Sequence, residues 1–305
     1  MSIAVSSATP DYNGSLTITA TPSGITPTSY TFQISDAESG IATVSQVSNV
    51  LAWTVNKVGT VTIGVTATDG SSGVGSSTSI TVVDPLNYAT KLFDYDMRNN
   101  ITLVDGLVDV VGDSSGNGHD VTAISSVNRA FYDAYGKRYD TGGSVKNLRN
   151  TASNPLSGAA DFTMFIKAQK QASGSVNNRI ISFGNIGTAF GIAPLDSAGA
   201  TIYVGTNDFA QYATYDVDVI GGEPFAVVKN GANPYDVYAD GVFTPVVAAG
   251  GSTPATLPTG NGIYLGTQNG NFPLIGCIQR IVAFDSVLTA TQIAAINERI
   301  KTLHP

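Results

Sequence analysis

The stretch Gly59–Gly70, GTVTIGVTATDG, alternates apolar and polar side chains over most of its length. Successive residues of a β-strand point to opposite faces of the sheet, so this alternation predicts a strand with one face in a core and the other in water. The same pattern recurs in SLTITA, SYTFQIS, VLAWTVN and STSITVV, with turn-forming Gly, Pro, Asn and Asp between the runs. Short strands at this spacing predict a β-sandwich.

The character of the sequence changes after Asp84-Pro85. Proline stops strand pairing, and larger aromatics, longer loops and a higher density of basic residues follow it. A chain of 305 residues is long enough for about two domains. We therefore expect one domain over residues 1–84 and a second over 85–305. Strand-like runs continue through the second, among them DFTMFIKAQ, RIISFG, TIYVGT and CIQRIVAFD.

The last element differs from the others. Ile293, Ile296 and Ile300 recur at helical spacing in TQIAAINERIKTL, and Thr289 with Gln292 forms a T-x-x-Q pair in front of them. Such a pair is typical of a capping box, in which two side chains satisfy free backbone N–H groups at a helix start. The sequence predicts one short C-terminal helix.

Two resemblances to known families follow from these runs. GTVTIGVTATDG with STSITVVD resembles the last two strands of a bacterial or viral immunoglobulin-like domain. DSSGNGHD, RYDTGGSV, PFAVVKNGANPYDVYADGV and GCIQRIVAFDSVLTATQIAAI resemble, in order, motifs of the laminin G-like, or concanavalin A-like, family. The resemblances imply an all-β chain, an immunoglobulin-like sandwich followed by a concanavalin A-like jelly-roll sandwich with one short helix. Gln279 stands where the family's closing strand often carries an acidic residue.

Composition excludes several classes of partner. Charged residues are 12% of the chain, against about 25% in average proteins, and the net charge is -8. Without a basic cluster we expect neither nucleic acid nor an anionic membrane surface as a partner. Cys277 is the single cysteine, so no disulfide forms within the chain, and MSIAVSSATP has no secretory-signal pattern.

The motif DSSGNGHD, residues 113–120, is open to two interpretations. Asp113, Asn117 and Gly118 fit the start of a calcium-binding EF-hand loop, but Ile124 falls where that loop needs a bidentate Glu. One interpretation is a calcium site made by Asp113, Asn117 and Asp120 with backbone carbonyls. The other, which the strand-like flanks favour, is a turn held by side-chain-to-backbone hydrogen bonds, with no cofactor.

The residues needed for catalysis are scarce. The chain has only three Glu residues, and none stands in the Glu-x-Asp-x-x-Glu pattern of glucanases on the concanavalin fold. The pairs Asp94/Asp96 and Asp216/Asp218 each project from one strand face, which we expect to be solvent-facing. The two histidines are His119, whose neighbour Asp120 is adjacent in sequence and badly placed to orient it, and His304, expected to fray near the chain end. We expect no enzyme.

The stretch TNDFAQYATYD is a candidate sugar-binding surface. It contains Asn207, Phe209, Tyr212 and Tyr215, and aromatic platforms with amide neighbours are the groups that a glycan contacts. A half-buried strand with a polar loop explains the same residues, and this interpretation is favoured over sugar binding.

Three functions remain. The paired sandwiches, low charge and hydroxyl-rich composition resemble bacteriophage virion structural proteins of the head decoration, head fibre or tail. That resemblance implies a homo-oligomer in a virion assembled in the host cytoplasm, with other virion proteins as partners and cell-surface polysaccharide as a receptor. The alternative is a carbohydrate-binding or adhesive module of a bacterial surface or secreted protein. A glycoside hydrolase is the third.

Overall fold

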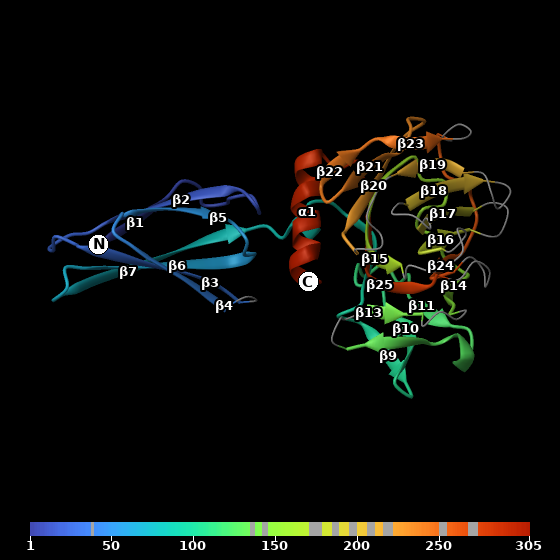
Figure 1. Ribbon diagram of the computed structural model, residues 1–305, viewed down its shortest axis with the longest axis horizontal. Coiled ribbons are helices and arrows are strands. Elements are labelled where there is room, and N and C mark those ends of the chain that lie inside the picture. The colour runs from blue at the N-terminus through green and yellow to red at the C-terminus, as the bar shows by residue number, and fades with distance from the viewer. Residues whose placement is uncertain are drawn as a thin grey trace. The chain divides into compact units, whose positions relative to one another are not determined.

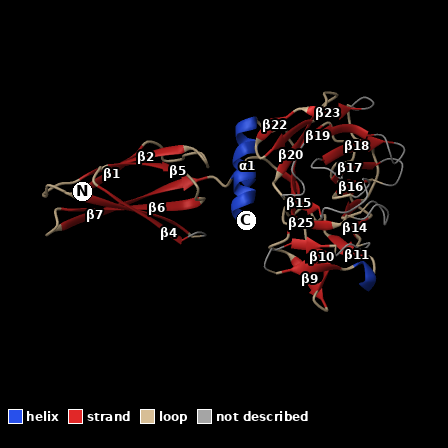
Figure 2. Ribbon diagram, viewed as in Figure 1, coloured by secondary structure: helices blue, strands red, loops and turns tan. Residues whose placement is uncertain are grey.

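A computed structural model describes residues 1–37, 40–134, 138–141, 146–170, 179–184, 189–194, 200–205, 211–215, 222–249, 255–267 and 274–305. The chain divides into two compact units, Met1–Tyr88 and Ala89–Pro305. Strands dominate both, and one α-helix ends the second (Figures 1 and 2), so the predicted all-β fold with a C-terminal helix is confirmed. In the described part of the chain, no helix combines the length and apolar character needed to span a bilayer.

Unit 1 is a sandwich of two antiparallel sheets. The first sheet has the order β1–β2–β5 and the second β4–β3–β6–β7. Asp84 caps the short 3₁₀-helix η1 (Pro85–Asn87), so the expected junction falls at its start. The strands are β1 (Ser2–Val5), β2 (Ser15–Thr21), β3 (Ser29–Asp36), β4 (Gly40–Gln46), β5 (Val50–Thr54), β6 (Gly59–Thr68) and β7 (Gly73–Val82).

The alternation read from the sequence sets the core of unit 1. Val61, Ile63 and Val65 of β6 are buried, whereas Thr62 and Thr66 on the opposite face are exposed. Trp53 departs from this pattern, because it stays partly exposed although Leu51, two residues before it on the same face, is buried. The reason is that β5 is an edge strand of a three-stranded sheet, so its end has fewer neighbours to cover it.

Unit 2 is one long antiparallel ladder that folds back on itself around a single core. Strands β22, β21, β20, β15 and β25 pair in that order, and β8 and β13 both pair with β25. From β13 the ladder continues through β12, β10, β11, β14, β24, β16, β17, β18 and β19 to β23, with β9 beside β10. The strands are β8 (Lys91–Asp96), β9 (Ile101–Val104), β10 (Leu107–Val111), β11 (Val121–Ala123), β12 (Ala130–Asp133), β13 (Arg138–Asp140), β14 (Leu148–Asn150), β15 (Asp161–Lys170), β16 (Ile181–Phe183), β17 (Ala189–Pro194), β18 (Ala200–Gly205), β19 (Gln211–Tyr215), β20 (Phe225–Asn230), β21 (Asp236–Ala239), β22 (Val242–Thr244), β23 (Val246–Ala249), β24 (Ile263–Leu265) and β25 (Gly276–Phe284).

The central strands of unit 2 are buried on both faces. Phe162, Met164 and Ile166 of β15 point into the core cluster, whereas Phe165 lies on the opposite face and meets Phe284 of β25 edge-to-face. This second face is covered by helix α1 (Ala290–Leu303) and the loop before it, because α1 contacts β20 and β22. Every residue of β25 is consequently buried.

The helix begins where the sequence predicts. The Thr289 side chain accepts a hydrogen bond from the Gln292 backbone N–H, and the Gln292 side chain accepts one from the Thr289 N–H. The predicted capping box is therefore confirmed. Ile293, Ile296 and Ile300 are fully buried and form the apolar stripe that packs on the sheet.

Candidate functional site

The DSSGNGHD loop joins β10 to β11. Asp113 is buried at its start, and Asp120 is exposed at its end. Gly116 and Gly118 have positive φ angles of 87° and 76°, a conformation that glycine adopts without the steric cost of a Cβ atom. The two glycines let the chain reverse within a few residues.

The Asp113 carboxylate organises this loop. Its Oδ1 accepts hydrogen bonds from the backbone N–H groups of Asp94 and Ser115, both at 2.9 Å. Its Oδ2 accepts from the Ser115 hydroxyl at 2.8 Å and from the His119 N–H at 3.2 Å. Asp120 Oδ1 in turn accepts from the Asp113 N–H at 2.7 Å. Protein donors therefore surround the Asp113 carboxylate on both of its oxygens.

The other groups offered as calcium ligands are also engaged. Asn117 Nδ2 donates to the carbonyl oxygens of Lys91 and Leu92 at 2.8 and 3.1 Å. The Asp120 carbonyl accepts from the Asn150 side chain at 2.9 Å. The described residues contain no group of three or more His, Cys, Asp or Glu side chains placed to hold a metal. A calcium site of Asp113, Asn117 and Asp120 stays a prediction, and the contacts favour the turn.

The loop carries one contact that the sequence did not reveal. His119 Nδ1 lies 2.5 Å from Ser153 Oγ, which follows β14 in the chain. A serine and a histidine at this distance are two parts of a nucleophilic site, but that chemistry also needs a group that orients the imidazole. Asp120, the neighbouring acid, binds the Asp113 N–H through its Oδ1. Ser153 is the one hydrogen-bond partner of the His119 ring within the described ranges, so the third member is lacking there.

The expectation that Asp94 and Asp96 face solvent is wrong. The two residues share one face of β8, as predicted, but they are only 1% and 2% exposed. Arg280 of β25 binds Asp94 with both Nε, 3.1 Å from Oδ1, and Nη2, 2.7 Å from Oδ2. Its Nη1 also lies 3.1 Å from Asp96 Oδ2. This face of β8 is the one on which the end of α1 packs, so the carboxylates are covered and are balanced by a guanidinium.

The expectation that His304 frays is also wrong. His304 is 1% exposed, and its Nε2 lies 3.2 Å from Asp96 Oδ1. Arg98 Nη2 approaches the other oxygen of Asp96 at 2.6 Å. Burial alone would raise the pKa of Asp96, but His304, Arg98 and Arg280 together lower it well below its usual value. Burial lowers the pKa of His304, and Asp96 opposes this only in part.

The sugar-binding candidates fall in a less fully described region. Asn207 and Phe209 lie outside the described residues, as do Asp216 and Asp218. Tyr212 and Tyr215 belong to β19, which pairs with β18 and β23. Ile202 pairs with Ala213 and Tyr203 with Gln211, so Tyr212 is the extra residue of a β-bulge. Bulges occur frequently beside binding sites, where they change the direction of a strand.

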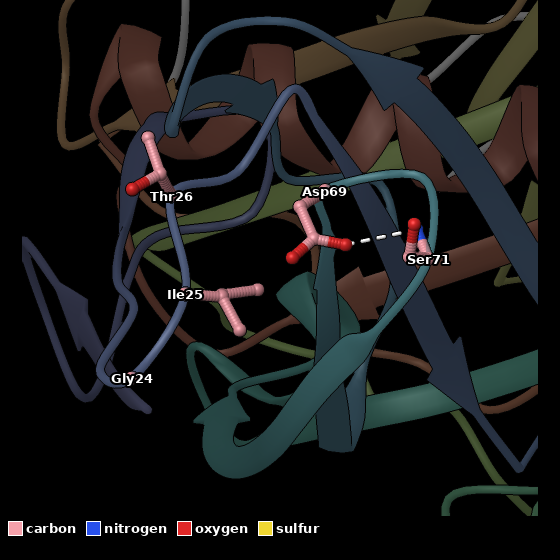
Figure 3. A pocket seen from close by; sticks show the side chains of 5 residues that line it. All are labelled: Gly24, Ile25, Thr26, Asp69 and Ser71. Carbon is pink, nitrogen blue, oxygen red and sulfur yellow. Dashed lines mark hydrogen bonds between the residues drawn. The ribbon is translucent and has the colours of Figure 1, made fainter.

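Unit 1 has a shallow depression between two of its loops (Figure 3). Gly24, Ile25 and Thr26 line one side, and Asp69 and Ser71 line the other. Asp69 Oδ1 accepts from the backbone N–H of Ser71 at 2.8 Å and of Ser72 at 2.7 Å, and these bonds lower its pKa. The Asp69 carboxylate thus shapes its own turn.

Comparison with known proteins gives a likeness of fold. No protein-family model matches the chain, and no curated protein matches it. The botulinum neurotoxin serotype D/C binding domain is similar at 14% identity and a TM-score of 0.50, over 71% of this chain and 53% of that one. Trypanosoma rangeli sialidase is similar at 10% identity and a TM-score of 0.45, over 94% and 52%. The carbohydrate-binding module CBM40 of Ruminococcus gnavus IT-sialidase is similar at 20% identity and a TM-score of 0.34, over 46% of this chain and 84% of that one.

The chain spans about half the length of the neurotoxin domain and the sialidase. What it shares with the neurotoxin binding domain is the β-sandwich architecture.

Proposed function

We propose that this chain is a non-catalytic adhesive protein that binds carbohydrate through unit 2. The observation that carries the proposal is that the carboxylates of Asp94 and Asp96 are buried and bound by basic side chains. This acid pair on one face of β8, which a hydrolase could have used, is buried and bound by Arg280, Arg98 and Lys91.

Glycoside hydrolysis needs two carboxyl groups that flank the sugar, and one of them must carry a proton. Arg280 and Lys91 both contact Asp94, at 2.7 and 2.9 Å. The pKa of Asp96 is lowered, so it stays ionised. Both carboxylates are buried, so neither is open to a substrate. The structural role of this pair supports a binding function for unit 2 over hydrolysis.

The proposed glycan surface is the region around β19. Tyr212 and Tyr215 stand on this strand with Asn207 and Phe209 just before it in the sequence. The bulge at Tyr212 interrupts the regular ladder. The β-sandwich fold shared with a neurotoxin binding domain is compatible with a receptor-binding role.

Screening on a glycan array tests this proposal. We expect the wild-type chain to bind a defined set of bacterial polysaccharides, and Tyr212→Ala and Tyr215→Ala to lose most of that binding. Phe243→Ala is the matched control, because it removes an aromatic ring that is 55% exposed on a different strand, β22. Absence of binding across diverse polysaccharides, or equal binding by all four proteins, contradicts the proposal.

A second candidate is a structural role in a bacteriophage virion, in which the protein also binds glycans on the host surface. What supports it is the composition, since only 12% of residues are charged. Low-charge, hydroxyl-rich surfaces suit an assembly of many identical copies. Immunogold labelling of native particles tests it, because a virion component gives labelled capsids or tails and a bacterial surface module gives labelled cells.

A further inference from the structure

Although this acidic chain has no long run of basic residues, its basic residues are densest in one segment. Residues 129–149 contain five of the fifteen basic residues and only two acidic ones, whereas the whole chain has a net charge of -8. The segment contains β12, β13 and β14. Strand β12 pairs with β10 and with β13, and β14 pairs with β11. A local excess of positive charge on a negative protein attracts anions to that place.

An exposed aromatic ring lies in the same segment. Phe131 of β12 is 54% exposed, although its neighbour Ala130 is fully buried. Ala130 therefore faces the core and Phe131 the outer surface, where its register partner on β10 is the half-buried Leu107. The exposed part of this ring offers apolar area against which a ligand can pack.

A lysine is held beside this ring. Lys146 Nζ lies 5.7 Å from the centroid of Phe131 and donates to the Val127 carbonyl at 3.2 Å. Two other cations of the segment have carboxylate partners, because Arg129 pairs with Asp109 and Arg138 with Asp133. Lys146 has no carboxylate partner among the residues that the structure describes.

We propose that Phe131 and Lys146 form a binding site for an acidic glycan. The apolar face of a sugar ring would stack on the exposed part of Phe131, and a carboxylate or sulfate on that sugar would bind the Lys146 ammonium. An aromatic platform contributes contact area, and a fixed cation contributes selectivity for negative charge. We infer an anionic ligand from charge complementarity, because the Lys146 ammonium has no carboxylate partner among the described residues even without a ligand.

The site deepens the proposed function, on which it rests for the carbohydrate nature of the ligand, but it lies on β12 and not on β19. Surface plasmon resonance measures binding to carboxymethyl-dextran, dextran sulfate and uncharged dextran. The comparison separates the contribution of the ligand's charge from that of its sugar rings. Poly-L-glutamate is the fourth probe, because it carries carboxylates without sugar rings. The proteins are the wild type, Lys146→Gln, Phe131→Ala and Tyr212→Ala, with far-UV circular dichroism to confirm that each is folded.

We expect the wild type to bind one or both acidic dextrans more tightly than dextran or poly-L-glutamate. Lys146→Gln should weaken that binding about tenfold, the loss of one charge-assisted contact of about 1.4 kcal/mol. Phe131→Ala should weaken it to a similar extent, and Tyr212→Ala should leave it unchanged.

Equal binding of acidic dextrans by wild type and Lys146→Gln overturns the site, as does binding of poly-L-glutamate as tight as that of the acidic dextrans. Failure to bind either acidic dextran overturns it whatever the glycan array shows. If the protein binds acidic dextrans but binds nothing on the glycan array, the result counts against the proposed β19 surface and not against the Phe131–Lys146 site.

Discussion

Asp94 receives both Nε and Nη2 of Arg280 on its carboxylate, while its backbone N–H donates to the carboxylate of Asp113. One residue of β8 thus connects the closing strand β25 to the DSSGNGHD loop, although Asp94 and Arg280 are 186 residues apart in sequence. Removing either connection has consequences that can be measured.

Asp94→Ala should destabilise unit 2 by about 3 kcal/mol, because the buried Arg280 guanidinium loses the carboxylate that binds its Nε and Nη2 and keeps only Asp96. Urea denaturation followed by far-UV circular dichroism measures this loss. Trp53, the single tryptophan, lies in unit 1, so its fluorescence does not report on the transition. Lys91→Ala is the matched control, since Lys91 contacts the same carboxylate but is partly exposed; we expect about 1 kcal/mol or less. Equal losses in both variants would show that Arg280 is not the dominant partner.

Two pH-dependent losses of stability follow from the burial of His304 and from the cations and hydrogen bonds around Asp96. The pKa of His304 is lowered from its usual 6.5 in the fold, so the unfolded chain binds protons first and stability falls as pH drops below about 6.5. The pKa of Asp96 is also lowered, from 3.8, so its contribution is present above about pH 4 and is lost below it. Thermal melts of wild type and His304→Gln between pH 7.5 and 3 separate the two. The variant should lose the upper phase and keep a smaller lower one, because Arg98 and Arg280 still contact Asp96. An unchanged upper phase would show that another group titrates there.

Asp113→Ala should destabilise unit 2 by about 3 kcal/mol, because four buried or half-buried donors lose their acceptor. Asp120→Ala removes one acceptor at an exposed position and should cost about 1 kcal/mol. We expect the wild-type melting temperature to be the same in EDTA and in millimolar calcium. A calcium-dependent rise that disappears in Asp113→Ala and Asp120→Ala would establish the metal site instead.

Thr289→Ala should cost about 1 kcal/mol, the usual effect of losing an N-cap side chain. Thr302→Ala makes the same chemical change inside the helix at an exposed position, where alanine is the better helix former, and should be neutral or slightly stabilising. Denaturant titration of both variants compares them directly. A smaller loss for Thr289→Ala than for Thr302→Ala would contradict the role of the capping box.

The wild-type chain should release no reducing sugar from bacterial polysaccharides, because the Asp94–Asp96 pair is committed to cations. Asp216→Ala is tested with Asp94→Ala, since Asp216 belongs to the other pair that the sequence offers. Product formation by wild type that disappears in either variant would show that the chain is a hydrolase.

Local sequence patterns were enough to predict much of the fold. Period-two alternation identifies Val61, Ile63 and Val65 as core residues, because the pleat of a strand fixes which side chains share a face. The pairing of Thr289 with Gln292 is equally local, as a helix start needs only residues within one turn.

The sequence alone determined the all-β class, the C-terminal helix and the shared face of Asp94 and Asp96. Only the tertiary structure decided whether that face meets water. Strand geometry sets the direction of a side chain, but its burial depends on what is packed above it. Here that is the end of α1, with His304 beside Asp96 and Arg280 reaching both carboxylates from β25. Contacts between residues so far apart along the chain exist only once the sheet has closed, so no local pattern could contain them.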